Sequence, residues 1–233
     1  MKNMSFLLLA FALGACSSDD VDLPDVVESV TVTTNFNDGE QGWVAGFSDY
    51  PQGNADIFEF ESEISAVPTT DDQSGFYLSA HNRSDDVFMF LKTQVTELEP
   101  NQRYLLEGTI SFYTNAGADC VGIGGSPGES VYLKTGATEI EPAQADYYMN
   151  IDIGSQSQSG NDSVVLGTIG VPEIGCDSDQ PVGQKTMAFT GSEGFEIISS
   201  EEGNMWLYFG TDSGYEGQTK MIYTEVEFTL TPQ

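Results

Sequence analysis

Apolar and polar residues alternate with a period of two along most of the chain after residue 30. In residues 103–114, Tyr104, Leu106, Ile110 and Phe112 fall on one side of the alternation, and mostly polar residues fall on the other. This pattern predicts half-buried strands, and no stretch shows the ~3.6-residue period of an amphipathic helix. The predicted strands cover residues 30–36, 57–61, 75–81, 87–92, 103–114, 130–134, 147–153, 163–169, 184–189, 204–210 and 220–231.

Glycine, asparagine, aspartate and proline lie between these segments, as turns between strands require. Short strands separated by turns, without an internal repeat, indicate an all-β protein that buries its apolar faces between two sheets. We therefore predict a two-sheet antiparallel β-sandwich, a jelly roll, as one domain over residues 30–233. Trp206 is expected in the core of a central strand, and Trp43 is expected to seal the sandwich.

Residues 1–15 have the layout of a bacterial signal peptide. Lys2 precedes an apolar run over residues 6–13, which is too short to span a bilayer. The segment Leu13-Gly14-Ala15-Cys16 resembles a lipobox, where bacterial lipoproteins are cleaved and lipidated. The resemblance implies cleavage before Cys16 and attachment of lipid, palmitate included, to that residue; the alternative is a buried structural cysteine.

Residues 16–29 are polar and acidic, contain Pro24 and show no periodicity, so we predict a flexible tether between lipid and domain. Lipoproteins with serine after the lipidated cysteine usually leave the inner membrane, and Ser17 holds that position. The resemblance therefore implies a protein anchored in the bacterial outer membrane, facing the periplasm or the cell surface.

The chain is strongly acidic, with 7 Lys and Arg against 37 Asp and Glu and a formal charge of −30. Cleavage would remove Lys2, which leaves 6 basic against 37 acidic residues and a charge of −31. Such a chain repels phosphate backbones, so nucleic-acid binding is excluded. The acidity suits solubility in salty water or sites for hard cations such as Ca²⁺.

Two further cysteines, Cys120 and Cys176, follow the lipidated one. In an oxidising compartment an isolated pair most simply forms a disulfide, which would close a loop of about 57 residues. The chain has a single histidine, so these cysteines make a poor metal site.

Alternation also predicts which residues face solvent. If the strands concerned share a sheet, its outer face carries aromatic rings interleaved with hydrogen-bonding groups: Tyr77, His81, Tyr113, Tyr132, Lys134, Tyr148 and Asp152. Sugars are bound by this combination, because rings stack on C–H faces and polar tips bind hydroxyls. The alternative is an ordinary solvated face with tyrosines that favour strands.

Several segments resemble carbohydrate-binding-module jelly rolls, also described as galactose-binding-domain-like. Asn35-Phe36-Asn37-Asp38-Gly39 with Gly42-Trp43 is similar to their first strand, and residues 98–104 resemble their L-x-P-N-x-x-Y strand entry. Residues 223–228 resemble the closing strand. The resemblance covers about residues 30–233 and implies a non-catalytic module that binds neutral glycan.

The same resemblance implies a structural Ca²⁺ between the first and last strands. Asp38 and Glu225 stand where the family places its acidic ligands, although aspartate is more common than glutamate at the second position. Backbone carbonyls and waters would have to complete the six to eight oxygens that Ca²⁺ takes.

Two other functions stay open. A sandwich without a sugar site could be structural or bind an envelope protein. Residues 131–136 also resemble the Tyr-x-Lys-x-Gly strand of alginate lyases, with Tyr132 and His81 as a possible proton-transfer pair. The Arg-rich strand of those lyases is missing and the charge repels polyuronates, so we expect no enzyme.

Overall fold

The computed structural model describes residues 27–84, 86–191 and 194–233. The predicted signal peptide, Cys16 and most of the tether lie outside the described residues. In the described part no helix is long and apolar enough to cross a membrane.

The chain forms two large antiparallel sheets, here called sheet A and sheet B. Sheet A contains β1 (Val30–Asn35), β3 (Glu61–Ala66), β4 (Ser74–His81), β6 (Arg103–Thr114), β11 (Gly183–Phe189), β12 (Phe195–Ile198) and β14 (Gln218–Pro232). Sheet B contains β2 (Val44–Ser48), β5 (Val87–Val95), β7 (Val131–Thr138), β10 (Val164–Thr168) and β13 (Met205–Ser213). A small ladder pairs β8 (Gln144–Ala145) with β9 (Tyr148–Met149), and two 3₁₀ helices are η1 (Phe36–Asp38) and η2 (Gln52–Phe58).

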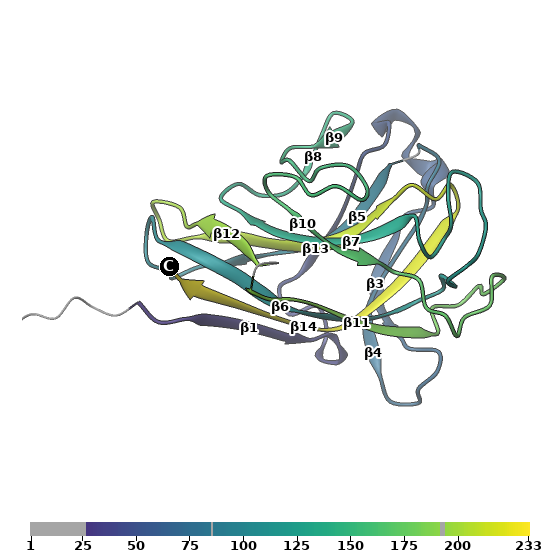
Figure 1. The fold of residues 1–233 in the computed structure, drawn as a ribbon, viewed down its shortest axis with the longest axis horizontal. Helices are drawn as coiled ribbons and strands as arrows, with labels where there is room; N and C mark the ends of the chain where they lie inside the picture. Colours follow the sequence, from purple (N-terminus) through teal and green to yellow (C-terminus); the bar gives the residue numbers. More distant parts are fainter. Residues whose placement is uncertain (1–26, 85, 192–193) are drawn as a thin grey trace, which may run out of the picture.

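The strand order is that of a jelly roll, which confirms the predicted fold. In sheet A the final strand β14 lies between β4 and β6, and β11 lies beyond β6. In sheet B the penultimate strand β13 lies between β5 and β7, with β10 beyond β7. Most connections thus cross between the sheets, the exceptions being β3–β4, β7–β10 and β11–β12, and the last two strands close the sandwich centrally (Figure 1).

The long strand β14 pairs with two partners on one edge. Residues 218–223 pair with β4, residues 225–230 pair with β1, and the register shifts between Tyr223 and Glu225. A bulge of this kind bends the strand and lets one strand serve two neighbours.

Aromatic side chains fill the centre of the sandwich. Trp43 is 1% exposed, its ring lies edge-on to Phe209 at 5.0 Å, and its Nε1 donates to Thr34 Oγ1 at 2.9 Å. The expected inward set of β6, from Tyr104 to Phe112, is at most 1% exposed. The alternation along these strands therefore predicted the core correctly, and Trp43 seals it as expected.

Three local predictions were wrong. Residues 57–61 do not form one strand, because η2 ends at Phe58 and Glu59 takes a left-handed φ of 52° before β3 begins. Residues 147–153 contribute only the short β9. Trp206 lies in the central strand β13 but points to the outer side of sheet B, since its neighbours Met205 and Leu207 occupy the core.

The segment of residues 139–163 packs across the outer side of sheet B, as the position of β8 and β9 shows (Figure 1). Met149, Ile151 and Ile153 alternate along it and bury themselves against Phe88, Phe90 and Tyr208 of the sheet. The predicted alternation at residues 147–153 was thus real, but it builds a second small core outside the sandwich.

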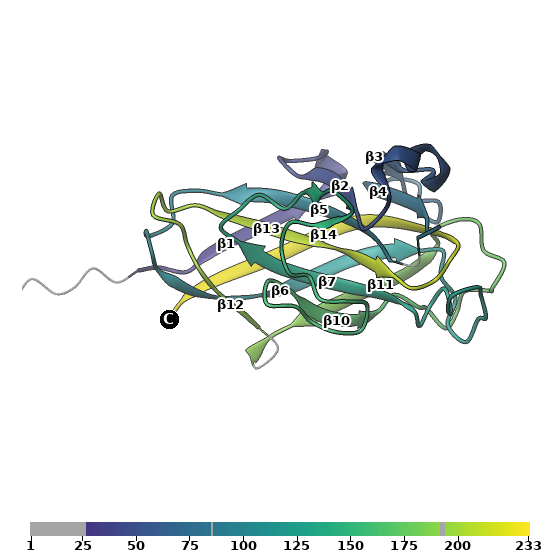
Figure 2. The same cartoon turned by 90° about the horizontal axis from the view of Figure 1, so that it is seen from above.

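The two ends of the sandwich differ. The first described residues and the C-terminus lie at one end, and the green loops around residue 175 lie at the other (Figures 1 and 2). A domain held at its N-terminus would therefore present the loops around residue 175 away from its point of attachment.

Candidate functional site

The predicted sugar face is divided between three places, so the expectation of one shared face was wrong. Tyr77 and His81 lie on β4 and Tyr113 on β6, all on the outer side of sheet A. Tyr132 and Lys134 lie on β7 in sheet B. Tyr148 and Asp152 belong to the segment that covers sheet B.

Lys134 is completely buried, with 0% exposure. Its Nζ donates to Asp212 Oδ2 at 2.7 Å and to the Ile153 carbonyl at 2.8 Å. The alternation correctly predicted that Lys134 points away from the core of the sandwich. The segment of residues 139–163 covers it on the outer side of sheet B. Lys134 cannot contact a ligand in this fold.

The other sheet B candidates are separated from one another. Tyr148 is 64% exposed on β9, and Tyr132 is half-buried beside Asp212 in the β7–β13 ladder. Asp152 accepts hydrogen bonds from Asn161 N at 3.0 Å and from Gly154 N at 3.1 Å, which lower the pKa of its carboxyl. Its carboxylate therefore stabilises a turn.

The expected lyase pair is also separated. His81 points outward from sheet A, while Tyr132 points outward from sheet B, on the opposite side of the sandwich. His81 lies 3.3 Å from Arg83 Nη2 and 3.9 Å from Glu59 Oε2, and burial and Arg83 lower the pKa of its ring. These residues connect the end of β4 to η2, so they provide no proton pair.

The outer side of sheet A carries a row of side chains across five strands. Cross-strand pairing places Glu63 beside Tyr77, Tyr77 beside Ile222, Ile222 beside Tyr113, and Tyr113 beside Gln184. Because neighbouring side chains on one face of a sheet touch, the row forms a continuous surface. Ile222 and Tyr113 are buried under Val67 of the β3–β4 turn, so only Tyr77 and the flanking polar residues reach solvent.

A hollow of about 220 Å³ lies beside Tyr77. Its lining comes from β3, the β3–β4 turn, β4, the segment before β11 and β14. The lining residues are Glu61, Glu63, Ser65, Ala66, Pro68, Tyr77, Gln180, Pro181, Lys220 and Ile222. We call this the Tyr77 hollow.

The Tyr77 hollow combines one aromatic ring with hydrogen-bonding groups of both kinds. The Tyr77 hydroxyl donates to Glu61 Oε2 at 3.3 Å. Burial, together with the nearby Glu61 carboxylate, raises the pKa of Tyr77, so its hydroxyl stays neutral. Glu61 and Glu63 supply acceptors and Lys220 supplies donors, while the ring supplies an apolar surface.

Sequence reasoning identified Tyr77 but missed Ile222, Lys220, Glu61 and Glu63. A signal for Ile222 was present: Met221, Ile222 and Tyr223 are three apolar residues in succession. A strand that is apolar on both faces is covered on both faces. The run therefore indicated that something packs on the outside of β14.

A larger hollow of about 570 Å³ lies between β12, the end of β7 and the segment over sheet B. Arg103 of β6 and Glu196 of the neighbouring β12 form an ion pair of 3.1 Å in its lining, and Ile140 and Ile198 are about half exposed there. Its lining, as far as the structure describes it, contains carboxylates and aliphatic side chains without an aromatic ring. It therefore lacks the surface on which a sugar ring stacks.

A buried acidic cluster lies between sheet B and its cover. Asp212 and Asp49 are 1% and 5% exposed, and Asp86 is partly buried beside them. Burial and the Asp212 carboxylate raise the pKa of Asp86 to about 7, and burial raises that of Asp49 to about 6. Asp212 and Asp49 are thus closed to solvent, and Asp86 is the partly exposed member of the cluster.

The pairing of β1 with β14 places the two predicted calcium ligands, Asp38 and Glu225, near each other. Asn35 pairs with Glu225, Asp38 follows three residues later, and both acids are exposed. Within the described ranges no three His, Cys, Asp or Glu side chains gather as a metal site. The two carboxylates alone do not fit a calcium ion, so binding there stays a prediction that depends on backbone oxygens and water.

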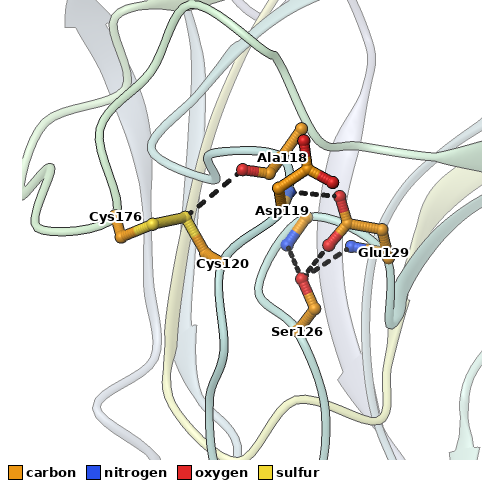
Figure 3. The surroundings of a disulfide bond; sticks show 7 residues. Ala118, Asp119, Cys120, Ser126, Glu129 and Cys176 are labelled. Carbon is orange, nitrogen blue, oxygen red and sulfur yellow. Dashed lines mark hydrogen bonds between the residues drawn. A yellow bond between two sulfur atoms is a disulfide. The ribbon is translucent and has the colours of Figure 1, made fainter.

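Cys120 and Cys176 form a disulfide, as predicted, with Cα atoms 5.4 Å apart. It joins the loop before β7 to the segment before β11 (Figure 3). These loops lie at the end of the sandwich far from the first described residues (Figure 1). A hollow of about 380 Å³ lies beside the disulfide, and we call it the second hollow. Its lining residues are Asn115, Pro127, Cys176, Asp177, Ser178, Asp179, Tyr215, Gln218 and Lys220.

Comparison with known proteins gives only distant structural similarity. No protein-family description matches the chain, and no curated protein matches it. The carbohydrate-binding module TmCBM61, solved with beta-1,4-galactotriose, is 12% identical over 85% of this chain and 94% of its own, with a TM-score of 0.39. The K1 cleaved adhesin domain of Lys-gingipain from Porphyromonas gingivalis W83 is 14% identical over 85% and 97%, with a TM-score of 0.38.

A third solved structure, the carbohydrate-binding module TmCBM27, studied for specific mannan recognition, is 12% identical over 86% of this chain and 98% of its own, with a TM-score of 0.36. At such identities and TM-scores, we base no conclusion about binding on these three proteins.

Proposed function

We propose that this protein is a non-catalytic carbohydrate-binding module that holds neutral glycan in the Tyr77 hollow. The observation that carries the proposal is the hollow itself: a half-buried aromatic ring beside Ile222, with Glu61, Glu63 and Lys220 in the same lining. A pyranose ring can stack its C–H face on Tyr77 while its hydroxyls bond to the carboxylates and the ammonium.

The charge of the site favours neutral ligands. Two glutamates and one lysine line the Tyr77 hollow, and the chain carries a formal charge of −30. A polyuronate would meet repulsion both at the site and from the whole protein, and that repulsion weakens with salt.

We further propose that lipid on Cys16 anchors the protein in the bacterial outer membrane, on the periplasmic or the outer side. The support is the lipobox-like sequence at Cys16 and the apolar run before it. The test is growth with labelled palmitate: label should enter the wild-type protein, and the Cys16→Ala variant should remain unlabelled.

The binding experiment is a screen of residues 27–233 against soluble neutral polysaccharides by affinity electrophoresis and calorimetry. Loss of stacking in Tyr77→Leu, which keeps an apolar side chain over Ile222, should weaken binding about tenfold. Tyr77→Phe keeps the ring and should bind more strongly than Tyr77→Leu. If Tyr148→Ala abolished binding instead, the site would lie over sheet B and the placement proposed here would be wrong.

A second candidate, docking of an envelope protein, is favoured by one observation. Val121 and Ile123, beside the disulfide, are 97% and 73% exposed. Isolated exposed aliphatic side chains are common, but two on one loop suit a protein contact. Failure of the folded protein to bind any neutral polysaccharide, with crosslinking to an envelope protein that Val121→Ser/Ile123→Ser removes, would support this function over the first.

A further inference from the structure

The Tyr77 hollow adjoins the second hollow beside the disulfide. Residues 176–181 run along both: residues 176–179 line the second hollow, and residues 180–181 line the first. Lys220 lines both, and its Nζ donates to the Asp179 carbonyl at 2.9 Å. The two hollows therefore meet at Lys220 and share one wall.

Together the hollows are longer than one sugar ring. Ile222 lies in the first and Gln218 in the second, four positions apart on β14. At the rise of a strand, these positions are on the order of 13 Å apart. A ligand that fills both hollows must therefore be a chain of linked sugars.

The second hollow also contains an aromatic ring. Tyr215, in the turn between β13 and β14, lines it together with Asn115 and Gln218. The backbones of Gly122 and Gly217 lie so close to the Tyr215 ring that a Cβ at either position would overlap it. The ring is therefore held in place, and each hollow presents one positioned tyrosine.

The disulfide fastens the shared wall. On the Cys120 side the loop is held by its own hydrogen bonds (Figure 3): Asp119 N donates to Glu129 Oε1 at 2.8 Å, and Ser126 Oγ accepts from Glu129 N at 3.2 Å. Cys176 begins the wall at residues 176–181. The bond therefore ties the wall to a loop that is fixed independently.

We infer that the ligand is a linear neutral glycan several units long, whose far part lies in the disulfide-fastened second hollow, an inference that rests on the proposed function. Short chains occupy the Tyr77 hollow alone. Longer chains also contact Tyr215 and the wall, and their affinity depends on the Cys120–Cys176 bond. Asp177 and Asp179 at the second hollow keep the preference for uncharged sugars.

The experiment measures affinity against chain length. Wild-type protein is titrated by calorimetry with cello-, manno- and β-1,4-galacto-oligosaccharides, from dimers to hexamers. In the series that binds, we expect affinity to rise about tenfold or more from the dimer to the hexamer. In the Cys120→Ala/Cys176→Ala variant, the disaccharide should bind as tightly as it does to wild type, and the increase in affinity with chain length should be lost.

Because loss of the disulfide can unfold the domain, Asp177→Arg provides a second variant. Asp177 is exposed and lines the second hollow, so a long side chain there fills the hollow while Cys120 and Cys176 stay bonded. Glu201→Arg, on the exposed turn between β12 and β13 and outside both linings, is the matched control for the charge change.

The outcomes separate the two proposals. A wild-type protein that binds none of the oligosaccharides or their polymers refutes the proposed function. A wild-type protein whose affinity does not change with length, or a folded Asp177→Arg variant that keeps the full rise, refutes the inference alone. Loss of the rise in affinity in Asp177→Arg but not in Glu201→Arg supports it.

Discussion

Removing the negative charge of Asp86 should stabilise the protein at alkaline pH. One buried ammonium, that of Lys134, faces the carboxyl groups of Asp212, Asp86 and Asp49. Asp212 Oδ1 and Asp86 Oδ1 are both buried and have no hydrogen-bond partner. A proton held between the two carboxyl groups would satisfy both oxygens, which a second negative charge cannot do.

The sign and the size of the effect of Asp86 on the free energy of unfolding follow from its pKa in the folded and unfolded states. Folding raises the pKa of Asp86 from its ordinary 3.8 to about 7, so the folded state binds a proton that the unfolded state lacks between these limits. Stability from this group is therefore fully present below about pH 4 and is lost as the pH rises through 7. The full difference is at most about 4 kcal/mol, because Asp86 is only partly buried and water screens the repulsion.

Asp86→Asn keeps the size of the side chain and cannot ionise. At pH 8 it should unfold at a higher urea concentration than wild type, with a gain of about 1–3 kcal/mol. At pH 5 the gain should be smaller, and it should disappear below about pH 4, where the folded and the unfolded states both hold the proton. Tryptophan fluorescence follows the transition, and Asp71→Asn, at an exposed position, is the control for loss of one charge.

The difference between variant and wild type isolates Asp86 from the general repulsion in so acidic a chain. If Asp86→Asn were destabilising at pH 8, or equally stabilising at both pH values, then Asp86 would be ionised and accommodated in the fold. In that case the assignment of a shared proton to Asp86 and Asp212 would be wrong.

Three further predictions concern stability. Lys134→Met should cost about 3–5 kcal/mol in urea unfolding, because it leaves the Asp212 carboxylate buried without its cation, and Lys134→Met/Asp212→Leu should recover part of the loss. Trp43→Ala should cost about 3–5 kcal/mol in the same assay, since it empties a site that is 1% exposed at the centre of the core. Reduction of the Cys120–Cys176 bond, which closes a separation of 56 residues, should cost about 4 kcal/mol; equal urea midpoints with and without reductant would contradict this.

The sequence by itself determined the fold class and most of the core. Alternation with a period of two requires one face of each strand to be buried, and only paired sheets provide this for so many strands. Tyr104, Leu106 and Phe112 are buried as their positions in β6 predicted. The disulfide was also predictable, because the chain offers only one pair of cysteines after residue 16.

Alternation could not decide which sheet a strand joins. Tyr77 on β4 and Tyr132 on β7 both point away from the core, yet the jelly roll places them on opposite sides of the sandwich. The two faces separate because strand order is set by pairing between residues far apart in the chain. For this reason Tyr77 alone of the expected sugar-binding residues lines the Tyr77 hollow.

Tertiary structure also decided which outward faces are open to solvent. The segment of residues 139–163 covers sheet B, which buries Lys134 and pairs it with Asp212, whereas the Tyr77 hollow on sheet A stays accessible. Apolar runs such as Phe88-Met89-Phe90-Leu91 and Met221-Ile222-Tyr223 showed that outer faces are covered, because water excludes apolar residues from both sides of a strand. Which segment covers each face depends on packing between residues far apart in the chain, so the local sequence pattern does not predict it.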